Sequence, residues 1–177
     1  MNTAELPARP ALDADLETEV CVVGAGIAGL TTAYLLAQEG KGVVVIDDGL
    51  VAGGESSRTT AHLTSALDDR YYRLEQLHGE DGARLARESH AAAVDLIERV
   101  SREEGIDCDF LRVDGYLFDA PGTTDSRLGR ELEAARRAGL AVEEVARAPI
   151  PGFDTGRALR FAGQAQFHPT KYYQGLV

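Results

Sequence analysis

Three glycines near the amino terminus carry the strongest chemical signal in this chain. Gly24, Gly26 and Gly29 form the pattern G-x-G-x-x-G. In such a pattern the first glycine permits a tight turn, the second lets a pyrophosphate approach the backbone, and the third lets a helix pack closely on a strand. The first N–H groups of that helix are unpaired and carry a partial positive charge, which attracts phosphate. The pattern therefore predicts a dinucleotide site.

A carboxylate stands where such a site requires one. Asp47 follows the apolar run Val43–Ile46, about 20 residues after the glycines, where its oxygens could accept hydrogen bonds from an adenosine ribose. An apolar strand is expected at Glu19–Val23 and a helix at Ile27–Gln38, which gives a βαβ unit with parallel strands. The alternative is a glycine-rich turn that binds nothing, but the flanking strand, helix and carboxylate favour a nucleotide.

A loop rich in glycine and hydroxyl groups follows the carboxylate. Residues 53–62 read Gly-Gly-Glu-Ser-Ser-Arg-Thr-Thr-Ala-His, where a simple NAD domain would proceed to its next helix. Backbone N–H groups and small hydroxyls placed beyond a ribose site suit the rest of a long, extended cofactor. The loop favours FAD over NAD, although an NAD-dependent Rossmann dehydrogenase and a plain polar surface loop remain as alternatives.

The remaining sequence predicts a second, mixed region. A helical segment is expected over residues 68–104 with a break at His78-Gly79, and a strand over residues 110–119 with a hairpin turn at Asp114-Gly115. Further expected elements are a helix at 127–138, a strand at 142–146, two short strands at 158–162 and 164–168, and a helix from Pro169. The fold class is α/β: a Rossmann-like βαβ unit with part of an α+β region, incomplete as it stands.

Composition narrows the functional class. The chain has 18 basic and 29 acidic residues, a net charge of −11, which argues against a nucleic-acid partner. Its two cysteines, Cys21 and Cys108, show no metal-type spacing and fit a reducing compartment. Because we find neither a signal peptide nor an apolar run long enough to span a membrane, we expect a cytoplasmic protein without a transmembrane segment.

The glycine pattern and the loop together resemble the FAD-dependent oxidoreductases of the D-amino-acid oxidase type, a group with the GR2-type flavoprotein fold that includes glycine oxidase, sarcosine oxidase and γ-glutamylputrescine oxidase. The segments at 58–64 (RTTAHLT), 69–72 (DRYY) and 164–169 (QAQFHP) resemble more specifically the bacterial branch that carries a C-terminal Rieske iron–sulfur domain. The resemblance extends from about Glu19 to the end of the chain.

The resemblance implies a set of FAD-binding residues. Those expected at the pyrophosphate are Gly24, Gly26, Ile27, Ala28 and Gly29; those expected at the ribose are Asp47 and Asp48; and those expected along the phosphates and the flavin are Gly54, Ser56, Ser57, Arg58, Thr60, Ala61 and His62. His62 stands where the wider group usually has glycine. It is the only candidate for a catalytic residue, and no metal ligand is expected.

The resemblance also implies a reaction and a domain plan. The parent protein is expected to oxidise the C–N bond of an amine or amino acid by hydride transfer to flavin, and to pass electrons on to a [2Fe–2S] centre outside this chain, which has no C-x-H or C-x-x-H sequence. We expect a flexible leader at 1–18, an FAD-binding region at 19–105, the start of a substrate-domain sheet at 106–168 and a truncated helix at 169–177. A third hypothesis is therefore a catalytically incompetent fragment.

Overall fold

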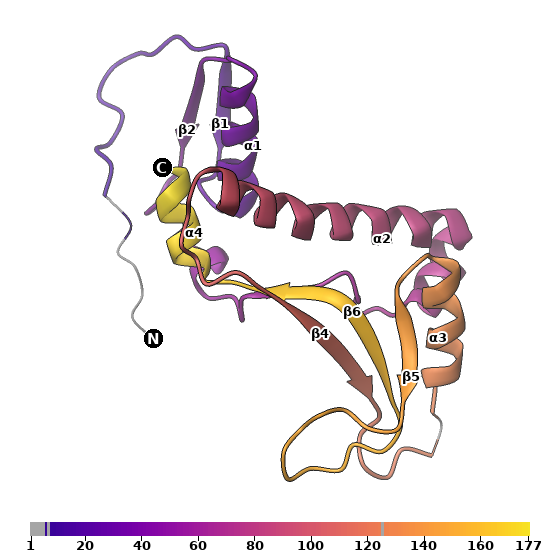
Figure 1. Ribbon diagram of the computed structural model, residues 1–177. Coiled ribbons are helices and arrows are strands. Elements are labelled where there is room, and N and C mark those ends of the chain that lie inside the picture. The colour runs from indigo at the N-terminus through magenta and orange to yellow at the C-terminus, as the bar shows by residue number, and fades with distance from the viewer. Residues whose placement is uncertain (1–5, 7, 125) are drawn as a thin grey trace. The chain divides into compact units, whose positions relative to one another are not determined.

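The βαβ unit that the glycine pattern predicts is present in the computed structural model, which describes residue 6, residues 8–124 and residues 126–177, except for the side chain of Ser57. Strand β1 (Val20–Val23) pairs in parallel with β2 (Val43–Ile46), with Val20 opposite Val43, and helix α1 (Ile27–Gln38) connects them (Figure 1). Predicted and observed bounds agree within one residue.

The chain forms two compact units. Unit 1 consists of Met1–His62, Val100–Phe110 and Phe167–Val177, and unit 2 of Leu63–Arg99 and Leu111–Gln166. Unit 1 therefore contains the glycine pattern and all of the residues expected at FAD. The expected division into an FAD-binding region and a substrate side stays a prediction, because the compactness of a unit does not identify what it binds.

Unit 1 is completed by the last helix of the chain. Helix α4 (Pro169–Leu176) begins with proline, whose missing N–H costs nothing at this position. It contributes the two buried rings of Tyr172 and Tyr173, which meet edge to face at 6.0 Å. An ion pair of 2.8 Å between Lys171 and Asp109 joins this helix to the preceding segment of the same unit.

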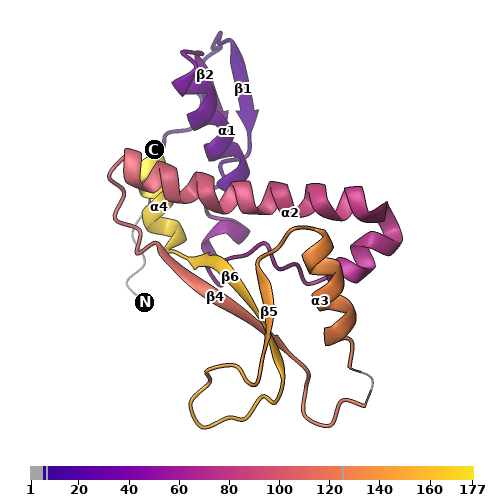
Figure 2. The ribbon, with the colours of Figure 1, turned by 45° about the vertical axis from the view of Figure 1, so that its right-hand side comes forward.

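Unit 2 is built on an antiparallel sheet. Strands β4 (Leu111–Phe118) and β5 (Val142–Val145) each pair antiparallel with β6 (Ala158–Gln166) (Figure 2). The two-residue strand β3 (His62–Leu63), of which Leu63 belongs to unit 2, also neighbours β6, in the order β3-β6-β4.

Two predictions about these strands are wrong. The sequence Asp114-Gly115 makes no hairpin turn, because β4 continues through it with a register shift between Val113 and Gly115. The Asp114 carboxylate instead accepts a 2.7 Å hydrogen bond from Arg160 Nε on β6. The two expected strands at 158–168 form a single strand, since Gly163 adopts φ +75° and continues it as an irregularity.

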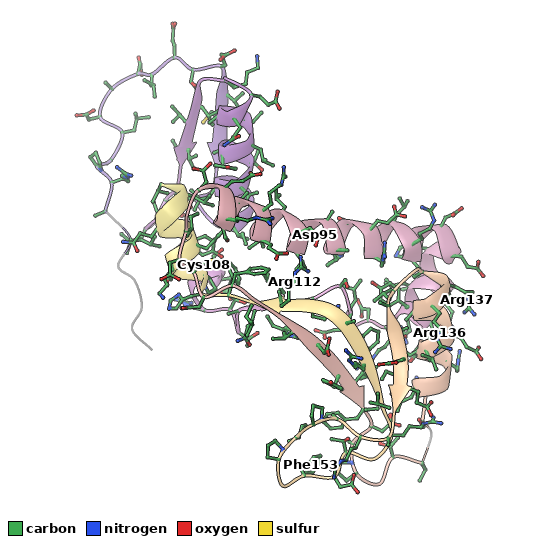
Figure 3. The ribbon with its side chains drawn as sticks, viewed as in Figure 1. Asp95, Cys108, Arg112, Arg136, Arg137 and Phe153 are labelled. Atoms are coloured by element: carbon green, nitrogen blue, oxygen red, sulfur yellow. The ribbon has the colours of Figure 1, made fainter. Side chains whose placement is uncertain are left out.

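Two helices belong to the core of unit 2. Helix α2 (Tyr71–Glu103) is interrupted at Gly79, where φ is +72°, as the sequence predicts, and α3 (Leu128–Arg137) carries a buried alanine pair. On β4, Arg112 pairs at 2.6 Å with Asp95 of α2 (Figure 3). The principal buried side chains of this core are Tyr71, Ala83, Leu128, Ala134, Ala135, Leu140, Val142, Leu159 and Phe161. No helix in the described part of the chain is both long and apolar enough to cross a membrane.

A buried amide organises the segment after β3. Gln164 is 2% exposed, and its Oε1 accepts hydrogen bonds from Thr64 Oγ1 and from the Ser65 backbone N–H, both at 2.7 Å. Its Nε2 donates to the Ala162 carbonyl at 2.9 Å. One side chain thus supplies an acceptor to the backbone N–H of the buried Ser65 and a donor to the Ala162 carbonyl.

We predict that Gln164→Leu lowers the free energy of unfolding by about 2–3 kcal/mol, because it removes these hydrogen bonds and leaves the Ser65 N–H buried without an acceptor. Urea denaturation checks the change, and Gln166→Leu, on an exposed position of the same strand, is the control. Equal effects of the two substitutions would show that the amide network contributes nothing.

A buried carboxylate caps α2. Glu131 is 2% exposed, and its two oxygens accept the N–H groups of Tyr71 and Tyr72 at 3.0 and 3.3 Å. Both donors lie in the first turn of α2, where no intrahelical acceptor exists. Burial nevertheless raises the pKa of Glu131 above 4.5, against the lowering effect of the two N–H groups.

This raised pKa gives a pH dependence with a defined sign. A carboxyl group whose native pKa is raised stabilises the fold below its unfolded pKa and loses that contribution as the pH rises through the native pKa. We therefore expect the stability of the wild type relative to Glu131→Gln to fall above about pH 4.5, by at most about 1.4 kcal/mol per pH unit. Chemical denaturation at a series of pH values above 4.5 measures this loss of stability. Glu133→Gln is the control, because Glu133 is exposed on α3, the helix that carries Glu131, and its stability should show no such dependence on pH.

Candidate functional site

The three glycines build the turn between β1 and α1. Gly24 has φ +104°, in the left-handed region, and its N–H donates to the Ile46 carbonyl of β2 at 2.8 Å. A Cβ on Gly29 would lie 1.8 Å from the Gly24 carbonyl oxygen, so this helix position contacts the turn directly. Gly26 is the N-cap of α1 and makes no side-chain cap. Gly26 therefore offers no side chain of its own to cap the first turn of α1, and no Cβ stands in the path of an incoming anion at this position.

The carboxylate of Asp47 faces this turn. Its Oδ2 accepts the Ala25 N–H at 2.6 Å and its Oδ1 accepts the Gly49 N–H at 2.8 Å. The Ala25 N–H, and next the Gly49 N–H, hold the pKa of Asp47 below its usual range. The group is therefore a fixed anion at the end of β2, and each oxygen keeps a lone pair for a further donor such as a ribose hydroxyl.

The hydroxyl loop returns to the start of α1. Gly54 precedes a short 3-10 helix, η1 (Glu55–Ser57), and Ser56 Oγ accepts the Ile27 N–H at 3.1 Å. A Cβ on Gly26 would lie 3.1 Å from the same oxygen. Ser56 thus lies against the first turn of α1, where the dinucleotide pattern places a phosphate.

A cavity of about 940 Å³ extends from this turn within unit 1. Its walls include Ala25, the end of β2, Asp47 and Asp48. Apolar residues of α1, such as Leu30 and Ala33, line another side. An apolar cavity with a carboxylate at one edge has the character of a cofactor site.

Several of the other predicted FAD residues are exposed. Ala28 is an exposed residue in the first turn of α1, and the Arg58 side chain is 72% exposed, 3.9 Å from Glu55. Thr60 and His62 are exposed, and no hydrogen bond joins either of them to the glycine turn within the described residues. The Ser57 side chain lies outside what the structure describes.

Ala61 is the one later loop residue with a special backbone. It has φ +65°, its N–H donates to Thr59 Oγ1 at 3.2 Å, and its carbonyl accepts the Phe167 N–H at 3.3 Å. A non-glycine residue at positive φ costs free energy and persists only where the surroundings hold it. The backbone of the loop is therefore fixed at Ala61. The next residue, His62, has an exposed side chain.

Sequence reasoning missed two residues near the turn. Ala52 is buried, has φ +52°, and its N–H donates to the Ala25 carbonyl at 2.8 Å, which ties the loop after β2 to the glycine turn. Tyr173 is buried, and its burial raises its pKa while the Ser56 hydroxyl opposes that shift. Neither position carries a sequence signal, because an alanine at positive φ and a buried tyrosine belong to no nucleotide-binding pattern.

Known proteins resemble nearly the whole chain. Over 176 residues it is 35% identical to the putative Rieske 2Fe-2S iron-sulfur protein YhfW of Bacillus subtilis (strain 168), covering 99% of this chain and 34% of that protein. Over 100 residues it is 33% identical to gamma-glutamylputrescine oxidoreductase of Escherichia coli (strain K12), covering 56% of this chain and 23% of that protein. The chain thus spans about a third or less of the curated relatives it matches.

A solved structure shares the fold. Glycine oxidase from Geobacillus kaustophilus superposes with a TM-score of 0.70 at 20% sequence identity, over 90% of this chain and 43% of that one. The family model described as FAD dependent oxidoreductase matches residues 19–177. This match decides between the two cofactors that the sequence left open, in favour of FAD. The chain belongs to the FAD-dependent oxidoreductase family.

Proposed function

We propose that this chain binds the ADP half of FAD, and that the protein to which it belongs oxidises the C–N bond of a small amine or amino acid. The observation that carries the first part is the glycine turn at the start of α1 beside Asp47, whose carboxylate accepts the Ala25 N–H at 2.6 Å. The names of the similar proteins, gamma-glutamylputrescine oxidoreductase and glycine oxidase, support the second part.

The chemistry of the donors fits the proposed ligand. The first N–H groups of α1 suit the pyrophosphate, and Gly24, Gly26 and Gly29 keep side chains out of its path. Ile27 contributes an N–H that Ser56 now occupies, so the Ser56 hydroxyl is positioned to contact the phosphates as well. The ribose would be held by Asp47, with Asp48 beside it on the wall of the cavity.

The remaining loop residues are proposed to follow the cofactor toward its flavin end. In the order of the chain these are Gly54, Ser57, Arg58, Thr60, Ala61 and His62. When bound, the flavin supplies hydride acceptance, and the protein supplies orientation and electrostatics. The structurally fixed Ala61 would set the direction in which the backbone passes the ring, and His62 would present an imidazole there.

The electron acceptor is proposed from a single relative. The Bacillus subtilis protein is named for a Rieske 2Fe-2S centre, and the present chain spans 34% of it. Within the described residues no group of His, Cys, Asp and Glu could hold a metal ion. We therefore propose an iron–sulfur centre as the electron acceptor on the name of this relative alone. The substrate is proposed only as a class, a small amine or amino acid.

The proposed cofactor site is tested with Gly26→Ala. The added methyl group would lie 3.1 Å from Ser56 Oγ, a contact that a small hydroxyl movement relieves, and Gly26 has φ −82°, which alanine accepts. The fold should therefore persist, while the methyl group obstructs the pyrophosphate. We expect FAD affinity, measured by calorimetric titration, to fall about a hundredfold or more.

The matched control is Gly129→Ala on α3, where an added Cβ meets nothing within 4 Å. It should bind FAD as the wild type does. Unchanged FAD affinity in Gly26→Ala, or wild-type binding of NAD in preference to FAD, would contradict the proposal.

A further inference from the structure

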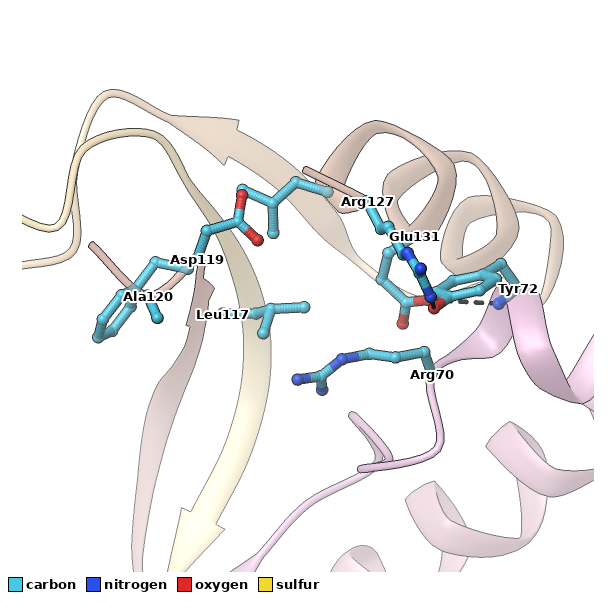
Figure 4. Close-up of a pocket in the computed structure, with 9 residues that line it drawn as sticks. Arg70, Tyr72, Leu117, Asp119, Ala120, Arg127 and Glu131 are labelled. Atoms are coloured by element: carbon cyan, nitrogen blue, oxygen red, sulfur yellow. Dashed lines mark hydrogen bonds between the residues drawn. The ribbon is translucent and has the colours of Figure 1, made fainter. Parts of the chain in front are cut away.

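A second cavity, of about 380 Å³, lies entirely within unit 2 (Figure 4). Polar side chains on its wall are Arg70, Tyr72, Asp119, Arg127 and Glu131, and the apolar part of the wall includes Leu117 and Leu128. Its volume is in the range of small-molecule sites, and side chains of both charges converge on it beside the apolar part of the wall.

Two opposite charges face this cavity without neutralising each other. Arg70 extends along Leu117, and Asp119 reaches the same space from the end of β4 (Figure 4). Among the described residues neither side chain forms an ion pair, and the only hydrogen bond of the Arg70 guanidinium is a 3.5 Å contact with the Leu67 carbonyl. The cavity thus offers a cation and an anion that are both available to a ligand.

The buried carboxylate on the wall does not satisfy Arg70. Both oxygens of Glu131 accept backbone N–H groups of α2, at 3.0 and 3.3 Å. Its charge still favours a guanidinium nearby, and Arg70 opposes the rise that burial causes in the pKa of Glu131. Glu131 therefore helps to retain Arg70 at the cavity, while the forked donor face of the guanidinium is left for another carboxylate.

The third polar group is also held in place. The ring of Tyr72 lies 4.9 Å from the Arg130 guanidinium, a cation–π contact, and its hydroxyl oxygen accepts a hydrogen bond from Arg127 at 3.3 Å. Since the oxygen acts as acceptor there, the Tyr72 O–H proton can be donated to a ligand.

The backbone fixes the position of Arg70 itself. It has φ +63°, the left-handed region, and its carbonyl accepts the N–H groups of Arg73 and Leu74, both at 3.1 Å. These two hydrogen bonds start α2 and hold Arg70 in a conformation that a non-glycine residue otherwise avoids. A guanidinium on such an anchored residue loses less freedom when it binds a carboxylate.

We propose that this cavity binds a small zwitterion of the free amino-acid type. Its carboxylate would accept from the Arg70 guanidinium and the Tyr72 hydroxyl, its ammonium would donate to Asp119, and a short apolar side chain would contact Leu117 and Leu128. The proposal does not depend on FAD binding, because every residue that lines the cavity belongs to unit 2.

The test uses the whole chain and L-valine, followed by amide-resolved NMR. Isobutylamine, which lacks the carboxylate, and isovalerate, which lacks the ammonium group, are the comparison ligands. We expect L-valine to cause saturable shifts at Arg70, Tyr72 and Asp119, and each comparison ligand to bind at least about tenfold more weakly.

Two substitutions test whether Arg70 and Asp119 each contribute to L-valine binding. Arg70→Gln and Asp119→Asn should each weaken L-valine binding at least about tenfold, while Arg147→Gln, an exposed arginine of the same unit, leaves it unchanged. The dispersion of the NMR spectrum reports whether each variant is folded. If Arg70→Gln does not fold, the result for Asp119→Asn decides the test. Absence of saturable shifts with L-valine, equal affinity for either comparison ligand, or full affinity in a folded variant overturns the proposal.

Discussion

Replacement of Gly29 by alanine will disrupt the βαβ unit and abolish nucleotide binding. The new Cβ would lie 1.8 Å from the Gly24 carbonyl oxygen, 2.9 Å from the Gly24 carbonyl carbon and 3.3 Å from Val22 Cγ1. Two of these atoms belong to the backbone of the turn, so no side-chain rotation relieves the overlap. We expect a loss of about 3 kcal/mol or more in the stability of unit 1.

Residue-resolved hydrogen exchange separates this effect from a general one. Protection of the amides of β1 and β2 should collapse in Gly29→Ala, because a two-stranded sheet depends on the helix that packs on it. The amides of β4 and β6 should retain their protection. Gly129→Ala is the matched substitution in an open helical position. Protected β1 amides together with normal FAD affinity in Gly29→Ala would contradict the role assigned to this glycine.

The second large effect is expected at Tyr71, in the core of unit 2. Its side chain is 0% exposed, and its hydroxyl donates to the Ser65 carbonyl. Tyr71→Ala would leave a cavity at the junction of α2 and the sheet, at a cost of about 3–5 kcal/mol. Tyr71→Phe keeps the ring and removes only the hydrogen bond, at a cost of about 1–1.5 kcal/mol. Thermal or urea denaturation should give this order, and similar losses for the two variants would show that packing is not the main contribution.

The difference in stability between the wild type and Tyr71→Phe should also depend on pH in the alkaline range. Burial, followed by the nearby Glu131 charge, raises the pKa of Tyr71 to about 12. A hydroxyl whose native pKa is raised stabilises the fold below its unfolded pKa and loses this contribution as the pH rises through the native value. The advantage of the wild type over Tyr71→Phe should therefore fall as the pH rises above about 10.

Local patterns predicted the elements of unit 1 because each has a local cause. A run of β-branched residues gives β2, the glycine turn starts α1, and Gly40 with φ +77° follows its end. In unit 2 the same reasoning placed a turn at Asp114-Gly115 and divided β6. Both errors have a non-local cause, since the pairing of β4 with β6 keeps the two strands continuous across their irregularities.

The candidate site was predictable to the extent that it is local. The pattern G-x-G-x-x-G and the spacing to Asp47 identify residues that the fold brings together, and the hydroxyl loop brings Ser56 to the N–H of Ile27. The contribution of Ala52 was not predictable, because it depends on a positive φ and on a hydrogen bond to Ala25. Likewise, Glu131 caps a helix nearly 60 residues away in sequence, a relation that only the tertiary structure reveals.

Amide-resolved NMR of the chain, titrated with FAD, with ADP and, separately, with NAD, tests whether the glycine turn binds FAD. We expect FAD and ADP to shift the same amides, those of residues 24–29, 47–49 and 54–57, while the amides of unit 2 stay unchanged. FAD should saturate at the lower concentration. Shifts that avoid the glycine turn, or a folded unit 1 that responds to neither FAD nor ADP, would contradict the assignment of this site.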